Sequence, residues 1–94
     1  MITSAQIRAA RSLVGLSQSQ VADATGLSIP TIKRAESESG LRASAAAVEA
    51  IRAALQTAGV IFLAEDGEGV GVRLRKSTAA EGLRPDQLNA ANDD

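Results

Sequence analysis

Residues 17–36 read SQSQVADATGLSIPTIKRAE, and this stretch holds two helix starts on either side of a glycine. At the first start, Ser17 can cap a helix and Gln20 can reach back to the capping residue, which is the pattern of a capping box. Gly26 stands where a helix ends in the left-handed conformation that glycine adopts without strain. The first half of the stretch therefore predicts a helix over residues 18–25.

The second half of the stretch predicts another short helix, over residues 29–36. Ser28 can cap this helix, and Pro30 falls in its first turn, where the missing N–H removes no helical hydrogen bond. Only residues 26–28 join the two helices. A connection this short, with glycine at its start, makes the helices cross at a steep angle.

One helix precedes this pair and another follows it. Thr3 and Gln6 repeat the capping-box spacing and predict a helix over residues 4–14. Farther along, apolar residues recur at intervals of three and four among alanines, which predicts a helix over residues 45–58. The expected fold is therefore mainly α, with four short helices around one small core.

The segment that follows favours a β-hairpin. Residues 60–64 form an apolar run, residues 65–69 (EDGEG) are typical of a turn, and residues 70–75 alternate between apolar and polar side chains. An isolated hairpin is marginal in water. We therefore expect it to dock on the last helix, to pair edge to edge with a second copy about a two-fold axis, or to do both.

These patterns divide the chain into three parts. Residues 1–58 are the predicted four-helix domain, and residues 59–76 are the predicted hairpin, which we expect to be the dimerisation element. Residues 77–94 are polar and acidic, and we expect a flexible tail there.

Composition limits the chemistry that the chain can perform. The 94 residues include neither Cys nor His, which excludes disulfides, thiolate zinc sites, imidazole catalysis and nearly every transition-metal site. No arrangement of the remaining polar residues places a nucleophile beside a base. No apolar run approaches the length of a membrane span, and the first residues lack the pattern of a signal peptide. We expect a cytoplasmic protein that is not an enzyme, with no metal, no cofactor and no membrane contact.

Charge is distributed unevenly along the chain. Residues 1–58 carry six Lys or Arg and four Asp or Glu, a net charge of +2, whereas residues 59–94 carry four and seven, a net charge of −3. The net charge of −1 for the whole chain argues slightly against a strong polyanion binder. A nucleic-acid interpretation must therefore depend on local pattern.

A recognisable spacing does occur inside residues 18–36. It is carried by Gln18, Val21, Ala22, Gly26, Leu27, Ser28, Thr31, Ile32 and Glu36. This spacing resembles the helix-turn-helix signature of the XRE family, which includes the phage repressor and Cro proteins, and the resemblance covers about residues 3–58. Ala35 departs from the pattern, because the family usually has a larger apolar residue there.

The resemblance implies that the helix over residues 29–36 lies in the major groove of DNA. The base contacts that it implies come from that helix and its cap: Ser28, Ile29, Pro30, Thr31, Lys33 and Arg34. The guanidinium of Arg34 can donate two hydrogen bonds to guanine O6 and N7, and Lys33 can donate to guanine or to phosphate.

Four further residues receive roles from the same resemblance. Gln18, at the start of the helix over residues 18–25, and Arg42 are implied to contact phosphates. Arg11 and Glu36 fall where the family often places a structural ion pair. A DNA contact is the alternative for Arg11.

The sequence therefore predicts a sequence-specific regulator that binds double-stranded DNA. We expect a homodimeric repressor that reads an inverted repeat, with half-sites about 34 Å apart, and activation would suit the motif equally well. Because fold does not determine function, two alternatives stay open. One is an antiactivator or adaptor that uses the same helices against a protein partner, and the other is an antitoxin-type autoregulator.

Overall fold

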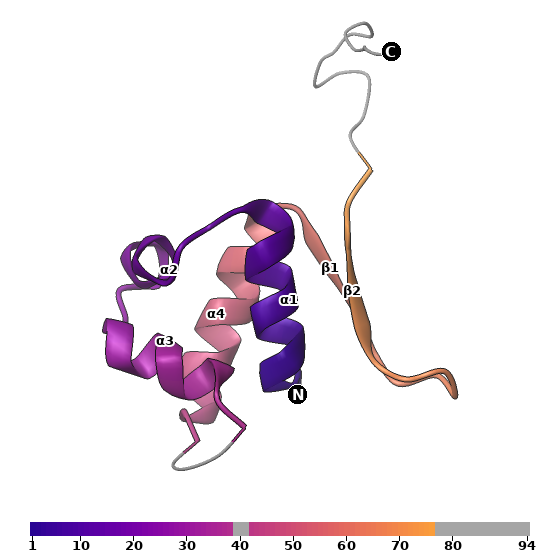
Figure 1. The fold of residues 1–94 in the computed structure, drawn as a ribbon, viewed down its shortest axis with the longest axis horizontal. Helices are drawn as coiled ribbons and strands as arrows, with labels where there is room; N and C mark the ends of the chain where they lie inside the picture. The colour runs from indigo at the N-terminus through magenta and orange to yellow at the C-terminus, as the bar shows by residue number, and fades with distance from the viewer. Residues whose placement is uncertain (39–41, 77–94) are drawn as a thin grey trace, which may run out of the picture.

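The computed structural model describes residues 1–38 and 42–76, and within these ranges four helices precede a two-stranded antiparallel sheet (Figure 1). In chain order the elements are α1 (Ser4–Val14), α2 (Gln18–Thr25), α3 (Ile29–Glu36), α4 (Ala45–Thr57), β1 (Val60–Leu63) and β2 (Gly71–Leu74). The predicted fold, mainly helical with a C-terminal hairpin, is confirmed. The predicted tail, residues 77–94, lies outside the described residues.

The helices begin and end where their capping residues predict. Thr3 and Ser17 each accept a hydrogen bond from a backbone N–H three residues on, and the glutamine at that position reaches back to complete a capping box. Gly15 and Gly26 close α1 and α2 in the left-handed conformation, with φ of 69° and 76°. Only α4 differs, because it ends at Thr57, one residue earlier than predicted.

The core is small and lies where the four helices and β1 meet. Its fully buried side chains come from every helix and from the first strand: Ile7, Val21, Ile32, Ile51, Leu55 and Val60. Ala22 and Ala35 are also buried, and their small side chains allow α2 and α3 to approach their neighbours closely. Beside Ala35, the position that departs from the family pattern, there is a hollow of about 20 Å³.

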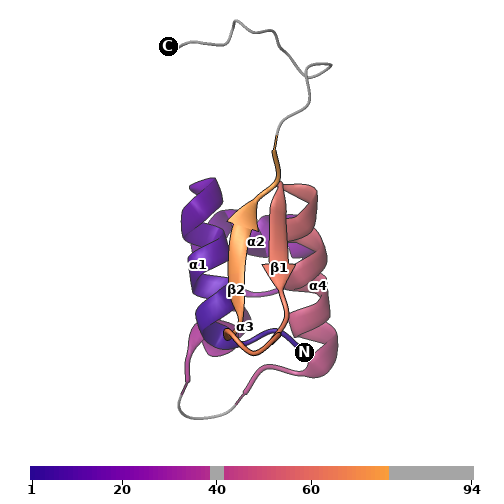
Figure 2. The same ribbon diagram turned by 90° about the vertical axis from the view of Figure 1, so that its right-hand side faces the viewer.

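The hairpin forms a layer on α1 and α4 (Figure 2). The register pairs Val60 with Leu74 and Phe62 with Val72. Val60 is fully buried, and Phe62 and Val72 pack against the core, so this face of the hairpin is turned toward the helices. The expected docking on the last helix is therefore observed, with α1 as a second support.

One buried side chain ties α1 to both strands. The side-chain oxygen of Gln6 accepts the N–H of Thr3, as in the predicted capping box. Its amide nitrogen donates to the carbonyl oxygens of Leu63 and Gly71, at 3.1 and 3.0 Å. The hairpin is thus attached by polar as well as apolar contacts.

In the part of the chain that the structure describes, no helix has the length and apolar character needed to cross a bilayer.

Candidate nucleic-acid interface

One side of α3 is buried in the core and the other faces solvent. Ile32, Ala35 and Glu36 are buried. Of the residues predicted to contact bases, Thr31 is half-buried and the other five are exposed: Ser28, Ile29, Pro30, Lys33 and Arg34. Ile29 is 40% exposed, which is a large apolar surface to leave in water. The predicted contact residues therefore share one accessible surface.

Three side chains on this surface are linked by hydrogen bonds. The hydroxyl oxygens of Ser28 and Thr31 lie 2.9 Å apart, and Arg34 donates from Nη2 to the same Thr31 oxygen at 3.2 Å. Because the bond runs back one turn, the guanidinium is directed toward the N-terminal end of α3. The side chain of Lys33, by contrast, makes no hydrogen bond or ion pair with any described residue.

The role of Thr31 in this chain of contacts was missed by sequence reasoning, which assigned this side chain to the bases alone. The signal was present, because Ser28, Thr31 and Arg34 follow one another at intervals of three residues. Side chains at this spacing are neighbours on a helix surface. The structure adds that the Thr31 hydroxyl orients the arginine.

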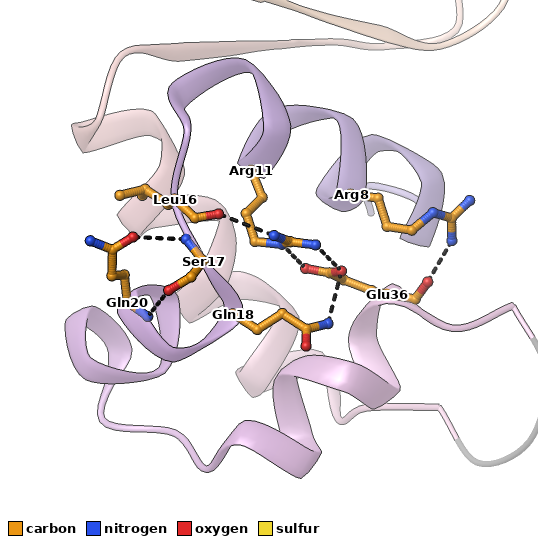
Figure 3. Close-up of polar contacts among 7 residues, drawn as sticks. All are labelled: Arg8, Arg11, Leu16, Ser17, Gln18, Gln20 and Glu36. Carbon is orange, nitrogen blue, oxygen red and sulfur yellow. Dashed lines mark hydrogen bonds and ion pairs between the residues drawn. The ribbon is translucent and has the colours of Figure 1, made fainter.

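Behind this surface, Arg11 and Glu36 form a two-pronged ion pair between α1 and α3 (Figure 3). Arg11 Nε lies 2.6 Å from Glu36 Oε2, and Nη2 lies 3.0 Å from Oε1. The third nitrogen of Arg11 donates to the carbonyl oxygen of Leu16. The hydrogen bond with Glu36 raises the pKa of Arg11, although partial burial opposes the rise. The pair thus holds α3 against α1 with its charges satisfied.

Gln18 contacts the same carboxylate. Its amide nitrogen donates to Glu36 Oε1 at 3.2 Å, so one amide hydrogen of this predicted phosphate ligand is already in use. This contact brings the start of α2 beside the end of α3 (Figure 3). The start of α2 and the exposed face of α3 are therefore held in a fixed relation.

Two more arginines lie near the end of α3. Arg8 donates to the backbone carbonyl of Glu36 (Figure 3). It also forms an exposed ion pair with Glu38 at 3.0 Å. Sequence reasoning missed Arg8, since this contact joins residues far apart in the chain. Arg42 is exposed, and together with Arg34 it lines the small hollow at the end of α3.

A family model described as helix-turn-helix matches residues 7–59 of the chain, 53 of its 94 residues. The match runs from α1 through α4 and ends just before β1, so the hairpin lies outside it. No curated protein matches the chain.

Proposed function

The chain belongs to the XRE family of helix-turn-helix DNA-binding regulators, and on that premise we propose that it is a dimeric repressor of sequence-specific action. The observation that carries the proposal is the exposed surface of α3. It presents two cations, Lys33 and Arg34, beside an exposed apolar side chain, Ile29. Hydrogen bonds to guanine and apolar contacts with the thymine methyl group are both used to read the major groove.

Each of these side chains suits a different feature of a base pair. Arg34 donates through its fork to guanine O6 and N7, and Lys33 donates to guanine or to a phosphate. Ile29 packs on the methyl group of a thymine, and Pro30 contributes shape because it has no N–H to donate.

The backbone of the duplex is held at two further points. The start of α2, with Gln18, offers N–H groups and the positive end of a helix dipole to one phosphate. Arg42 binds a second phosphate beyond the other end of α3. These contacts set the register of α3 in the groove without reading the sequence.

The scaffold supports this use of α3. A specific contact requires that the reading helix be rigid before it meets DNA. Here Glu36 connects α3 to Arg11 of α1 and to Gln18 of α2, with three hydrogen bonds on one buried carboxylate. These hydrogen bonds keep the start of α2, which we propose binds phosphate, in a fixed position relative to the face of α3, which we propose contacts bases.

A dimer binds DNA more tightly than a single copy does. One short helix makes few contacts, and a dimer reads two half-sites of an inverted repeat that lie one helical turn, about 34 Å, or a multiple of it apart. A dimer bound across a promoter in the cytoplasm represses by excluding the polymerase.

Selection of bound sites from random duplex DNA tests the proposal in one experiment. We expect enrichment of a two-fold symmetric sequence with guanine at a fixed position in each half. Titration of the selected site across salt should then give a log–log slope of several units, because phosphate contacts release counterions. A selection that enriches no sequence, together with an affinity that does not change with salt, would contradict DNA binding and favour the protein-adaptor alternative.

A further inference from the structure

The second strand of the hairpin, β2, has one edge without a neighbouring strand. The N–H of Arg75 donates to the carbonyl oxygen of Gly59 at 2.6 Å, so the backbone at this position is directed toward the first half of the hairpin. Bonded and non-bonded pairs alternate along an antiparallel ladder, so Val72 and Leu74 direct their N–H and C=O groups away from β1. No residue in the described ranges forms a hydrogen bond with these outward groups. They line a free strand edge.

An apolar patch lies beside this edge, between β2 and α1. Gln6 contacts Gly71 at the start of β2, and Leu13 lies on the same face of α1 two turns later. These two turns rise about 10.5 Å, and the strand from Gly71 to Leu74 rises about 10 Å. Since α1 and β2 run in the same direction (Figure 2), Leu13 and Leu74 lie at the same level. Leu74, the partner of the buried Val60, is on the helix side of the sheet. Leu13 and Leu74 are nevertheless 42% and 50% exposed.

The other side of β2 carries positive charge. Arg73 and Arg75 alternate with Val72 and Leu74, so they project from the opposite side of the strand. Both arginines are exposed, and neither side chain forms a hydrogen bond or ion pair within the part of the chain that the structure describes. The free edge therefore lies between an apolar patch on its helix side and a cationic strip on its outer side.

We propose that an extended segment of a partner protein, with aliphatic and acidic side chains in alternation, adds to the free edge of β2 as a further strand. Its backbone pairs with the outward N–H and C=O groups of Val72 and Leu74, which is the general mode of strand addition. Its aliphatic side chains face the helices and cover Leu13 and Leu74. Its acidic side chains lie opposite Arg73 and Arg75, where opposite charges on adjacent strands stabilise the pairing.

The chain's own segments fit this edge poorly. The β2 strand of a second copy would bring its own Arg73 and Arg75 against these arginines, and like charges on adjacent strands repel. The β1 strand of a second copy has no acidic residue. Residues 77–94 contain one Arg and four Asp or Glu, but at no point do aliphatic side chains alternate with acidic ones. Charge and pattern therefore favour a separate protein.

The partner segment and DNA occupy opposite sides of the molecule. Figure 1 shows the hairpin on one side of α1 and α4, and α2 and α3 on the other side. The exposed surface of α3 therefore stays open when a strand is added to β2. The inference goes beyond the proposed function, because it gives the regulator a means of bringing a second protein to its DNA site.

Titration of the full-length chain with labelled peptides tests the proposal. The probe is a peptide of about eight residues that alternates Val and Glu, and its control alternates Val and Lys. In fluorescence anisotropy we expect the Glu peptide to bind with saturation and the Lys peptide to bind roughly tenfold more weakly. Hydrogen exchange followed by NMR locates the contact. The Glu peptide should slow exchange of the N–H groups of Val72 and Leu74, whereas that of Arg73, which faces β1, serves as the internal control.

Two sets of variants identify the edge by its chemistry. Arg73→Glu with Arg75→Glu should reverse the preference, so that the Lys peptide binds more tightly than the Glu peptide. Leu13→Gln should weaken binding of the Glu peptide several-fold, because it removes apolar surface from the patch. Ile29→Gln makes a similar change at an exposed apolar residue of α3 and should leave the affinity for the peptide unchanged. Circular dichroism checks that each variant folds.

Four results would overturn the proposal: no saturable binding of the Glu peptide up to about 1 mM, equal affinity for the two peptides, unchanged exchange at Val72 and Leu74, or a preference that the arginine variant does not reverse. Sedimentation of the wild type tests the other occupant, since dimers that the Glu peptide dissociates would assign the edge to a second copy. Binding to a DNA half-site is measured separately, so its failure would refute the proposed function and leave the peptide result standing.

Discussion

Gln6 in α1 donates a hydrogen bond to the carbonyl oxygen of Gly71 in β2 at 3.0 Å, across a separation of 65 residues. The same amide nitrogen reaches Leu63 on the other strand, while the side-chain oxygen caps α1 through Thr3. The Gln6 residue is 5% exposed. One side chain therefore starts the first helix and attaches the last element of the described fold to it.

Replacing Gln6 with Leu should destabilise the protein by roughly 2–3 kcal/mol, because partly buried carbonyl groups of both strands lose this donor. Urea denaturation measures the loss. Gln20→Leu is the matched control, since Gln20 completes the other capping box but is exposed and contacts no strand. That change should cost about 1 kcal/mol or less. Equal losses in the two variants would show that the contact with the hairpin adds nothing.

Replacing Glu36 with Ala should cost about 2–4 kcal/mol, because Arg11 then keeps a partly buried charge without its partner. The double variant Arg11→Met with Glu36→Leu should be less destabilised than Glu36→Ala, since it removes both charges together. Chemical denaturation of the two variants checks this order. A double variant that loses at least as much as the single would mean that the pair itself, rather than the orphaned charge, dominates.

The pH dependence of this pair follows from the direction of the Arg11 shift. Because contact with Glu36 raises the pKa of Arg11, the contribution of the charged guanidinium is fully present below the pKa of the unfolded chain. It is lost only as pH rises through the still higher folded value. Arg11 should therefore stay charged from pH 7 to about 9, and its contribution to the free energy of unfolding should be constant there. Denaturation curves should show the same difference in stability between the wild type and the Arg11→Met variant across this range.

Replacing Arg34 with Ala should weaken binding to the selected DNA site by about 1–3 kcal/mol and relax the choice of base at one position in each half-site. Competition binding against single-base variants of the site measures both effects. Lys33→Ala is the comparison on the same helix. If Arg34→Ala lowers affinity for random DNA by the same factor, Arg34 contacts a phosphate and not a base.

Replacing Thr31 with Val should reduce base discrimination at the Arg34 position several-fold while leaving the fold intact, because Val keeps the shape but removes the oxygen that orients the guanidinium. Thr31→Ser keeps the oxygen and should keep the discrimination. Affinities for the selected site and for its variant at that base give the ratio. Identical ratios for Val and Ser would assign Thr31 no part in positioning Arg34.

Much of the candidate interface was predictable because it lies on one short helix. The order of cap, proline and cations in residues 28–34 predicts which side chains share the exposed face, since helical periodicity alone separates them from Ile32 and Ala35. The sequence did not predict that Thr31 contacts Arg34 or that Arg8 contacts the end of α3. The first depends on which rotamer Arg34 adopts, and the second depends on how α1 crosses the end of α3.

The order of residues already determines the helices of this protein and the turn between α2 and α3, because caps, glycine exits and apolar spacing act within about four residues of one another. Only the packed structure determines that Gln6 reaches the strands, that Glu36 collects donors from two other helices, and that the hairpin lies across α1 and α4. These contacts join residues that are distant in the chain. They depend on how the apolar faces pack together, so no local pattern encodes them.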